Sequence, residues 1–177
     1  MIELIMEFID LLLKRRSVRR YSDENVSKKD LDLILKAGLL APTGRNKKEC
    51  TFLVIENKET IKKLSELKDS GSQFLAGADK AIVVVGNTVI SDTWIEDSSI
   101  ALGYMHLMAA SLDVGSCWVQ IRNRTVGGEK SENLARQILG LDDFYGIVGI
   151  LGLGMPEGEV RPYAMDEIDK SRVHFLV

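Results

Sequence analysis

Lys14-Arg15-Arg16-Ser17-Val18-Arg19-Arg20-Tyr21 places five cations around one serine, directly after an apolar segment, in a protein whose net charge is −3. Like charges repel each other, so such a cluster needs a counter-anion or a solvated position. Arginine forks match pairs of phosphate oxygens, and a serine hydroxyl adds a short hydrogen bond. The stretch therefore predicts a phosphate clamp. On spacing alone, two alternatives stay open: cations that close a helix C-terminus and a basic nucleic-acid patch.

A second motif, Ala41-Pro42-Thr43-Gly44-Arg45-Asn46, follows a helical pattern. Taken together with Arg15-Arg16-Ser17-Val18-Arg19, it resembles the FMN-dependent nitroreductase family. That family opens with Arg-x-Ser-x-Arg or Lys on the flavin phosphate and ribityl chain, and it continues with an Ala-Pro-Ser-x-x-Asn loop. The resemblance covers most of the chain and is strongest over residues 14–55.

The resemblance implies a fold and a set of flavin contacts. The fold is α+β, of the α/β sandwich type, with a central, mostly antiparallel sheet flanked by helices and a C-terminal strand exchanged to the partner subunit. In family members, the loop around Asn46 reaches the flavin across the subunit boundary, and the strand around Trp118 runs along the ring. The implied cofactor-binding residues are Arg15, Arg16, Ser17, Arg19, Pro42, Thr43, Gly44, Asn46, Trp118, Val119, Gln120, Ile121, Gly154 and Arg161.

Two departures from the family pattern concern these contacts. The family continues its loop as Asn-x-Gln-Pro-Trp, whereas this chain has Asn46-Lys47-Lys48-Glu49-Cys50, which lacks those side chains and makes the rim unusually basic. The turn Gly154-Met155-Pro156 lacks the family's aromatic residue, although Arg161 follows it and is expected to close the phosphate site. Trp118 fits a core aromatic equally well.

Composition limits the class of protein. With 177 residues, 45% of them hydrophobic and 28% charged, the chain is typical of one soluble globular domain spanning residues 1–177. A dedicated nucleic-acid binder would be basic overall. Two distant cysteines, Cys50 and Cys117, make neither a disulfide framework nor a metal-ligand spacing, and His106 and His174 are isolated. The apolar N-terminus carries its positive charges after the apolar run, unlike a signal peptide. We therefore expect a reduced cytoplasmic protein that contacts no membrane.

Hydrophobic periodicity predicts helices and strands in alternation. Predicted helices cover residues 2–14, the segment after Ser27, the segment after Asn57, residues 94–112, and a segment that Gly140 ends. Predicted strands cover residues 51–55, 81–85, 117–121, 147–154 and the short end 173–177. Three glycines in the strand 147–154 indicate close approach of a ligand or another backbone. The pattern alone supports α/β and α+β equally.

The resemblance also implies an activity. NADH or NADPH would reduce the bound flavin, which would then pass electrons to a small acceptor such as a nitroaromatic or a quinone, by a ping-pong mechanism. Arg19 is the candidate for stabilising negative charge on the ring, and no catalytic side chain is required. Alternatives are another flavin task, such as reductive dehalogenation or flavin breakdown, and a nucleic-acid binder without a cofactor.

Two apolar helices predict a homodimer. The helix over residues 100–112 is apolar nearly all round, and so is much of the helix over 2–14. Such helices are core or interface helices. A short isolated strand at a terminus is marginal unless it joins a sheet edge. We expect a homodimer with the flavin at the interface and the tail on the partner's sheet.

Overall fold

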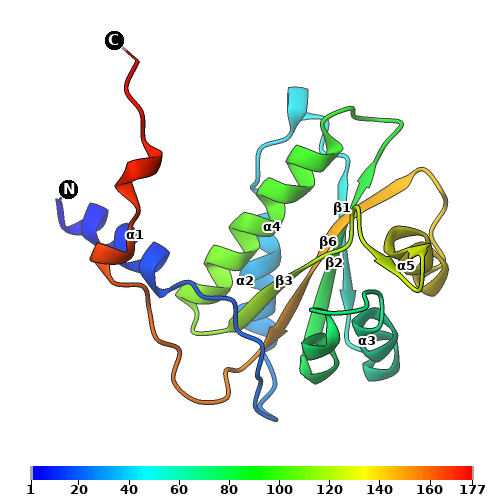
Figure 1. Ribbon diagram of the computed structural model, residues 1–177, viewed down its shortest axis with the longest axis horizontal. Helices are drawn as coiled ribbons and strands as arrows, with labels where there is room; N and C mark the ends of the chain where they lie inside the picture. The colour runs from blue at the N-terminus through cyan, green and yellow to red at the C-terminus, as the bar shows by residue number, and fades with distance from the viewer. Residues whose placement is uncertain (1, 177) are drawn as a thin grey trace.

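The centre of the fold is a four-stranded antiparallel sheet (Figure 1). A computed structural model describes the backbone of residues 2–176 and the side chains of residues 8–176. The strand order is β1-β2-β6-β3. The strands are β1 (Cys50–Ile55), β2 (Lys80–Asn87), β3 (Gly115–Gln120) and β6 (Tyr145–Gly154). The predicted antiparallel sheet is therefore confirmed, and β3 and β1 are its two edges.

Helices cover both faces of this sheet, as Figure 1 shows. On one face, α2 (Lys28–Leu39) and α4 (Trp94–Ser111) enclose a core that includes Ile34, Leu102 and Met105. On the other face, α3 (Lys58–Ser65) and α5 (Ser131–Leu139) enclose a second core. Because β2 and β6 are buried on both sides, they are continuous apolar runs rather than alternating ones.

Local capping explains the helix boundaries. The Ser27 hydroxyl accepts a hydrogen bond from the backbone N–H of Asp30 at 3.0 Å, and the Asn57 side chain does the same for Thr60 at 2.9 Å. Gly140 ends α5 in the left-handed conformation, at φ 65°. These boundaries confirm the predictions made from the sequence.

Smaller elements complete the chain. A hairpin of β4 (Thr125–Val126) and β5 (Glu129–Lys130) surrounds the turn that the sequence predicted there. Single 3₁₀ turns occur at η1 (Gly44–Asn46), η2 (Gln73–Gly77), η3 (Met165–Glu167) and η4 (Lys170–Arg172). Among residues 2–176, no helix has both the length and the apolar character needed to cross a bilayer.

Helix α1 (Ile2–Lys14) and the C-terminal arm, residues 157–176, stand beside the body of the molecule (Figure 1). They touch where the backbone N–H of Tyr163 donates to the carbonyl of Leu13 at 2.9 Å. The predicted tail strand is not formed in the single chain: residues 173–176 are irregular, and Leu176 is fully exposed. Within the described chain no sheet edge lies beside them, so their backbone groups have no strand partner. Residue 177 lies outside the described residues.

Candidate functional site

The basic segment lies along the edge of the sheet. The backbone N–H of Val18 donates to the carbonyl of Ser116 at 3.0 Å, and Ser17 pairs with Ser116 as an isolated parallel bridge. Further along, Tyr21 pairs with Pro156, in the turn after β6. The predicted clamp is therefore held between the start of β3 and the end of β6, two neighbouring strands.

The same pairing brings Arg161 to the clamp, because the backbone N–H of Glu157 donates to the carbonyl of Arg20 at 3.1 Å. A surface cavity of about 290 Å³ lies between the two segments. Cations from opposite ends of the sequence thus share one cavity. Its lining includes Arg16, Ser17, Val18, Arg19, Arg20, Pro156, Glu157, Glu159, Val160 and Arg161.

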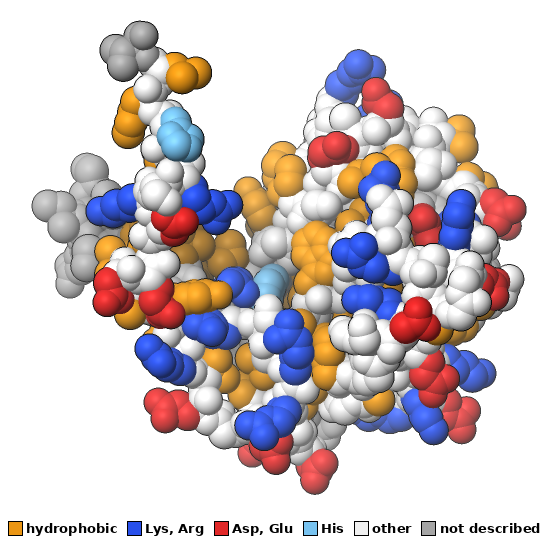
Figure 2. Space-filling view, in the orientation of Figure 1, with side chains coloured by type: hydrophobic (Ala, Val, Ile, Leu, Met, Phe, Trp, Pro, Cys, Tyr) orange, Lys and Arg blue, Asp and Glu red, His pale blue; other side chains and the backbone are white. Residues whose placement is uncertain are grey.

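The charge of this cluster is largely uncompensated. Lys14 pairs with Asp113 at 2.7 Å, but no other clamp cation forms an ion pair among the side chains of residues 8–176. Glu157 and Glu159 line the cavity, and neither forms an ion pair with a described side chain. Figure 2 shows Lys and Arg side chains gathered around the foot of the hollow between the C-terminal arm and the body. A cluster left positive in this way suits a phosphate dianion.

The clamp arginines point in different directions. The Arg15 guanidinium lies 3.1 Å from the Nε2 atom of His106, on α4. The Arg16 guanidinium stacks 3.9 Å above the centre of the Tyr163 ring. One face of this guanidinium is therefore covered by the C-terminal arm. Arg19 donates weakly, at 3.5 Å, to the carbonyl of Ser17. Arg15 and Arg19 also lie close enough to Cys117, on β3, for their charges to oppose the rise in its pKa.

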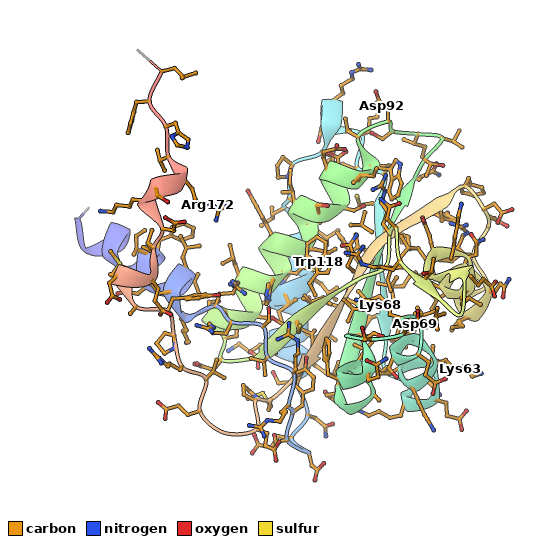
Figure 3. The ribbon with its side chains drawn as sticks, in the orientation of Figure 1. Lys63, Lys68, Asp69, Asp92, Trp118 and Arg172 are labelled. Carbon is orange, nitrogen blue, oxygen red and sulfur yellow. The ribbon has the colours of Figure 1, made fainter. Side chains whose placement is uncertain are left out.

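Strand β3 presents its own outer edge beyond Ser116 (Figure 3). Trp118 and Gln120 are half-buried, and the indole N–H of Trp118 donates to the side-chain oxygen of Gln120 at 3.0 Å. The side chains of Val119 and Ile121 point into the core, so only their backbone groups can reach a ligand. Trp118 also packs on the α4 side of the core. Its position therefore fits both a core aromatic and a residue that contacts the flavin.

The glycines of β6 make room for aromatic side chains. A Cβ atom on Gly154 would lie 2.7 Å from the Tyr21 ring, and one on Gly146 would overlap Trp94. A Cβ atom on Gly115, opposite Gly154 in the sheet, would lie 2.9 Å from the Gly154 carbonyl oxygen. Within the described chain, the close approach expected at this strand is thus made by the protein's own rings and backbone.

The second predicted motif lies elsewhere. The backbone N–H of Gly44 donates to both carboxylate oxygens of Asp97, at 3.0 Å each, in the first turn of α4. Arg45, Asn46 and Lys48 all have positive φ, between 53° and 56°. Such backbone is uncommon outside glycine and is held here by specific contacts. Pro42, Thr43 and Asn46 line a cavity of about 340 Å³.

The two motifs occupy opposite ends of α4, as Figure 1 shows. Asp97 holds the Gly44 loop, whereas His106, nine residues later, contacts Arg15. At 1.5 Å per residue these anchor points are about 14 Å apart along the helix. In one chain the two motifs therefore line two separate cavities instead of one, whereas Arg15, Gly44, Gly154 and the predicted residues of 118–121 line neither.

Buried acid and thiol groups lie behind the second cavity. Glu49 is 5% exposed and one of its oxygens has no hydrogen-bond partner among the described residues. Burial raises the pKa of Glu49, and the nearby Asp97 carboxylate raises it further. Burial also raises the pKa of Cys50 to about 11 and the pKa of Cys117 above its usual value. Both thiols are therefore protonated at neutral pH, as expected of small apolar side chains rather than nucleophiles.

Sequence reasoning missed three residues of the clamp region. His106 was interpreted as isolated, but it contacts Arg15 across 91 residues of sequence. The Tyr163 ring stacks against Arg16. Lys68 lies close enough to Cys117 for its charge to oppose the rise in that thiol's pKa, as the charge of Arg19 does. Burial, followed by the charge of Arg124, lowers the pKa of Lys68 itself. No local signal in the sequence marks these contacts, because each joins segments that meet only in the folded chain.

Comparison with known proteins gives one consistent result. The Nitroreductase family profile matches residues 12–71 and 65–155. A protein of Archaeoglobus fulgidus, provisionally named NADH dehydrogenase/NAD(P)H nitroreductase, is 34% identical over 95% of this chain and 97% of its own.

Two solved structures are also similar. An FMN-dependent nitroreductase from Clostridium difficile R20291 is 38% identical and superposes with a TM-score of 0.91, covering 94% of this chain and 98% of the other. A provisionally named nitroreductase from Desulfovibrio desulfuricans, solved in complex with FMN, is 26% identical with a TM-score of 0.70, covering 92% and 95% of the two chains.

Proposed function

This chain belongs to the nitroreductase family and is a nitroreductase-like oxidoreductase, and we propose that it uses bound FMN to carry electrons from NADH or NADPH to a small acceptor. The observation that carries this proposal is the uncompensated cation cluster at the edge of β3. Similarity to FMN-dependent nitroreductases supports the choice of flavin. When bound, FMN supplies the redox chemistry, since it accepts hydride from a nicotinamide and returns electrons to a second substrate.

The clamp fits the phosphate end of FMN. Arg15 and Ser17 are proposed to bind the phosphate and the ribityl chain, and Arg161 is proposed to close the phosphate site from the far end of the sequence. The hydrogen bond from Glu157 to Arg20 joins the segment of Arg15 and Ser17 to that of Arg161, and the bond from Val18 to Ser116 ties the first segment to β3. A phosphate carries a charge of about −1.5 to −2 near neutral pH, which such a cluster would offset.

The open edge of β3 fits the ring end. Trp118, Val119, Gln120 and Ile121 are proposed to give backbone and polar contacts along the ring. Arg19 is proposed to offset negative charge that develops there, since fixed cations are most effective in a site that excludes water. With Lys68 close by, the same side of the sheet carries two cations.

The separation of the two cavities supports a site shared between two copies. Pro42, Thr43, Gly44 and Asn46 are proposed to reach the flavin of the partner subunit, because the Gly44 loop is held at the far end of α4 from its own clamp. Just before this loop, Leu39 and Leu40 are 70% and 78% exposed, and Tyr104, farther along α4, is 44% exposed. A homodimer would cover these apolar side chains. The C-terminal arm, which has no strand partner in the described chain, is proposed to add to the partner's sheet.

Two measurements test this proposal. The purified protein should be yellow, with a flavin absorbance band that NADH or NADPH bleaches under anaerobic conditions and that nitroarenes or quinones restore. A screen of both nicotinamides against nitroarenes, quinones and halotyrosines would identify the donor and the acceptor. A colourless protein that also fails to bind added FMN would overturn the proposal. A single domain and a reduced cytoplasmic location stay predictions.

A further inference from the structure

His106 is a buried histidine that contacts the clamp but not the cavity. It lies on α4 at 9% exposure. Its Nδ1 atom is 2.6 Å from the hydroxyl oxygen of Ser116, and its Nε2 atom is 3.1 Å from a guanidinium nitrogen of Arg15. Both ring nitrogens therefore have a hydrogen-bond partner: Nδ1 contacts Ser116 at the start of β3, and Nε2 contacts the clamp residue Arg15.

The direction of these hydrogen bonds follows from the groups involved. A guanidinium only donates, so the Nε2 atom of His106 must accept and carry no proton. The proton of the neutral ring is then on Nδ1, which donates to the Ser116 hydroxyl. Burial, followed by the charge of Arg15, lowers the pKa of His106 to about 4, which agrees with a neutral ring at physiological pH.

A neutral acceptor has a specific consequence for Arg15. Among the described side chains no carboxylate pairs with Arg15. His106 therefore fixes the guanidinium without cancelling its charge, whereas an aspartate or glutamate would compete with an anionic ligand. A pre-positioned arginine loses less conformational entropy when it binds, so its contact with the ligand is stronger.

Ser116 couples this contact to the rest of the clamp. It is 2% exposed, and its carbonyl accepts the backbone N–H of Val18 at 3.0 Å while its side chain accepts from His106. The same residue pairs with Ser17. The buried contacts from Arg15 to His106 and from His106 to Ser116 thus set the position of Arg15 relative to Ser17.

We propose that His106 is a positioning residue for the flavin: its Nε2 acceptor holds Arg15 in the arrangement that binds FMN, while its Nδ1–H bond to Ser116 orients the ring. This inference rests on the proposed function, because it names the residue that orders the phosphate clamp. On this proposal His106 acts through Arg15 rather than by its own contact with the flavin, and it does not line the cavity beside the clamp.

Matched amide substitutions separate positioning from a general structural role. In His106→Gln the side-chain oxygen replaces Nε2, so the acceptor for Arg15 is kept. In His106→Asn the amide replaces Nδ1, so the Ser116 contact is kept and the acceptor for Arg15 is lost. The FMN dissociation constant, measured by fluorescence titration of the flavin-free protein, should stay within about threefold of wild type in the first variant. In the second it should rise by about tenfold or more, as expected for the loss of a hydrogen bond to a charged group.

A double-mutant cycle with Arg15→Ala gives a second readout. If His106 acts through Arg15, His106→Asn should change the FMN dissociation constant by less than about twofold in the Arg15→Ala background. Equal losses in both backgrounds, or equal affinities of the Gln and Asn variants, would overturn the positioning role while leaving the proposed function intact. A wild-type protein that does not bind FMN would overturn both. Thermal unfolding of each flavin-free variant shows whether a changed affinity comes from misfolding.

Discussion

Gly44 donates its backbone N–H to both carboxylate oxygens of Asp97, at 3.0 Å each, and this contact holds the loop of positive-φ residues on the first turn of α4. The hydroxyl of Thr93 donates to the same carboxylate at 2.9 Å. A Cβ atom on Gly44 would overlap the Thr93 side chain. Only glycine therefore allows the loop and the helix to approach this closely.

Gly44→Ala should displace Thr93 and weaken the hold of Asp97 on the loop. We expect it to lower the free energy of unfolding by about 1–3 kcal/mol, the usual cost of overpacking, and to weaken FMN binding. Thermal unfolding and FMN titration measure the two effects. Gly77→Ala is the matched control, because no atom lies within 4 Å of its added Cβ. A Gly44→Ala protein as stable as that control would contradict the packing argument.

Arg15→Ala should lower FMN affinity by about 1.5–3 kcal/mol, the worth of a hydrogen bond to a charged group. Ser17→Ala should lower it by less, since a neutral hydroxyl carries no charge. Lys63→Ala, which removes a cation from α3, controls for the general change in charge (Figure 3). Unchanged FMN occupancy in both clamp variants would remove the clamp from the proposed site.

The pH dependence of stability should report on His106. Its pKa is about 4 in the folded protein, below the ordinary value near 6.5 that it has when unfolded. Between these two pH values the unfolded state binds the proton and the folded state does not. The stabilisation that comes from keeping His106 neutral is therefore complete above pH ~6.5 and is lost as the pH falls toward 4. The difference in unfolding free energy between wild type and His106→Gln should therefore shrink by about 3 kcal/mol from pH 7 to pH 4. A difference that stays constant over this range would show that the histidine is not buried in its neutral form.

Turnover should alternate between the two substrates. The chain has 177 residues and no Gly-x-Gly-x-x-Gly after a strand, so we expect the nicotinamide and the acceptor to use one site in turn. Initial rates at several acceptor concentrations should give parallel double-reciprocal lines. Lines that intersect would indicate a ternary complex instead.

Deleting residues 173–177 should weaken both dimerisation and FMN retention. Phe175 is 86% exposed and Leu176 fully exposed in the single chain, so a partner surface is expected to cover them. The dimer interface should exceed about 2,000 Å², the range of obligate homodimers. Sedimentation at low concentration, with flavin absorbance recorded together with the protein, compares truncated and full-length chains. A truncated chain that stays a flavin-loaded dimer would show that the tail has no such role, and a yellow monomeric full-length chain would contradict the shared site.

Local patterns predicted most of the secondary structure. Side-chain caps at Ser27 and Asn57 and the left-handed Gly140 are short-range interactions, so their helix boundaries could be placed from neighbouring residues. The β-branched run over 81–85 predicted β2, since a strand buried on both faces needs apolar residues throughout. The tail 173–177 was predicted as a strand, but its described residues, 173–176, are irregular in the single chain, because a strand needs an edge to pair with.

The sequence by itself determined which elements form and which segments carry the chemistry: the cations of residues 14–20, the loop over 42–46 and the alternation of helices and strands are all written in consecutive residues. Only the tertiary structure decided how these segments meet. It brought Arg161 to Arg20, placed His106 behind Arg15 and set the Gly44 loop at the opposite end of α4 from the clamp. The physical reason is that such contacts join residues far apart along the chain, so their partners are chosen by strand register and helix packing rather than by any local preference.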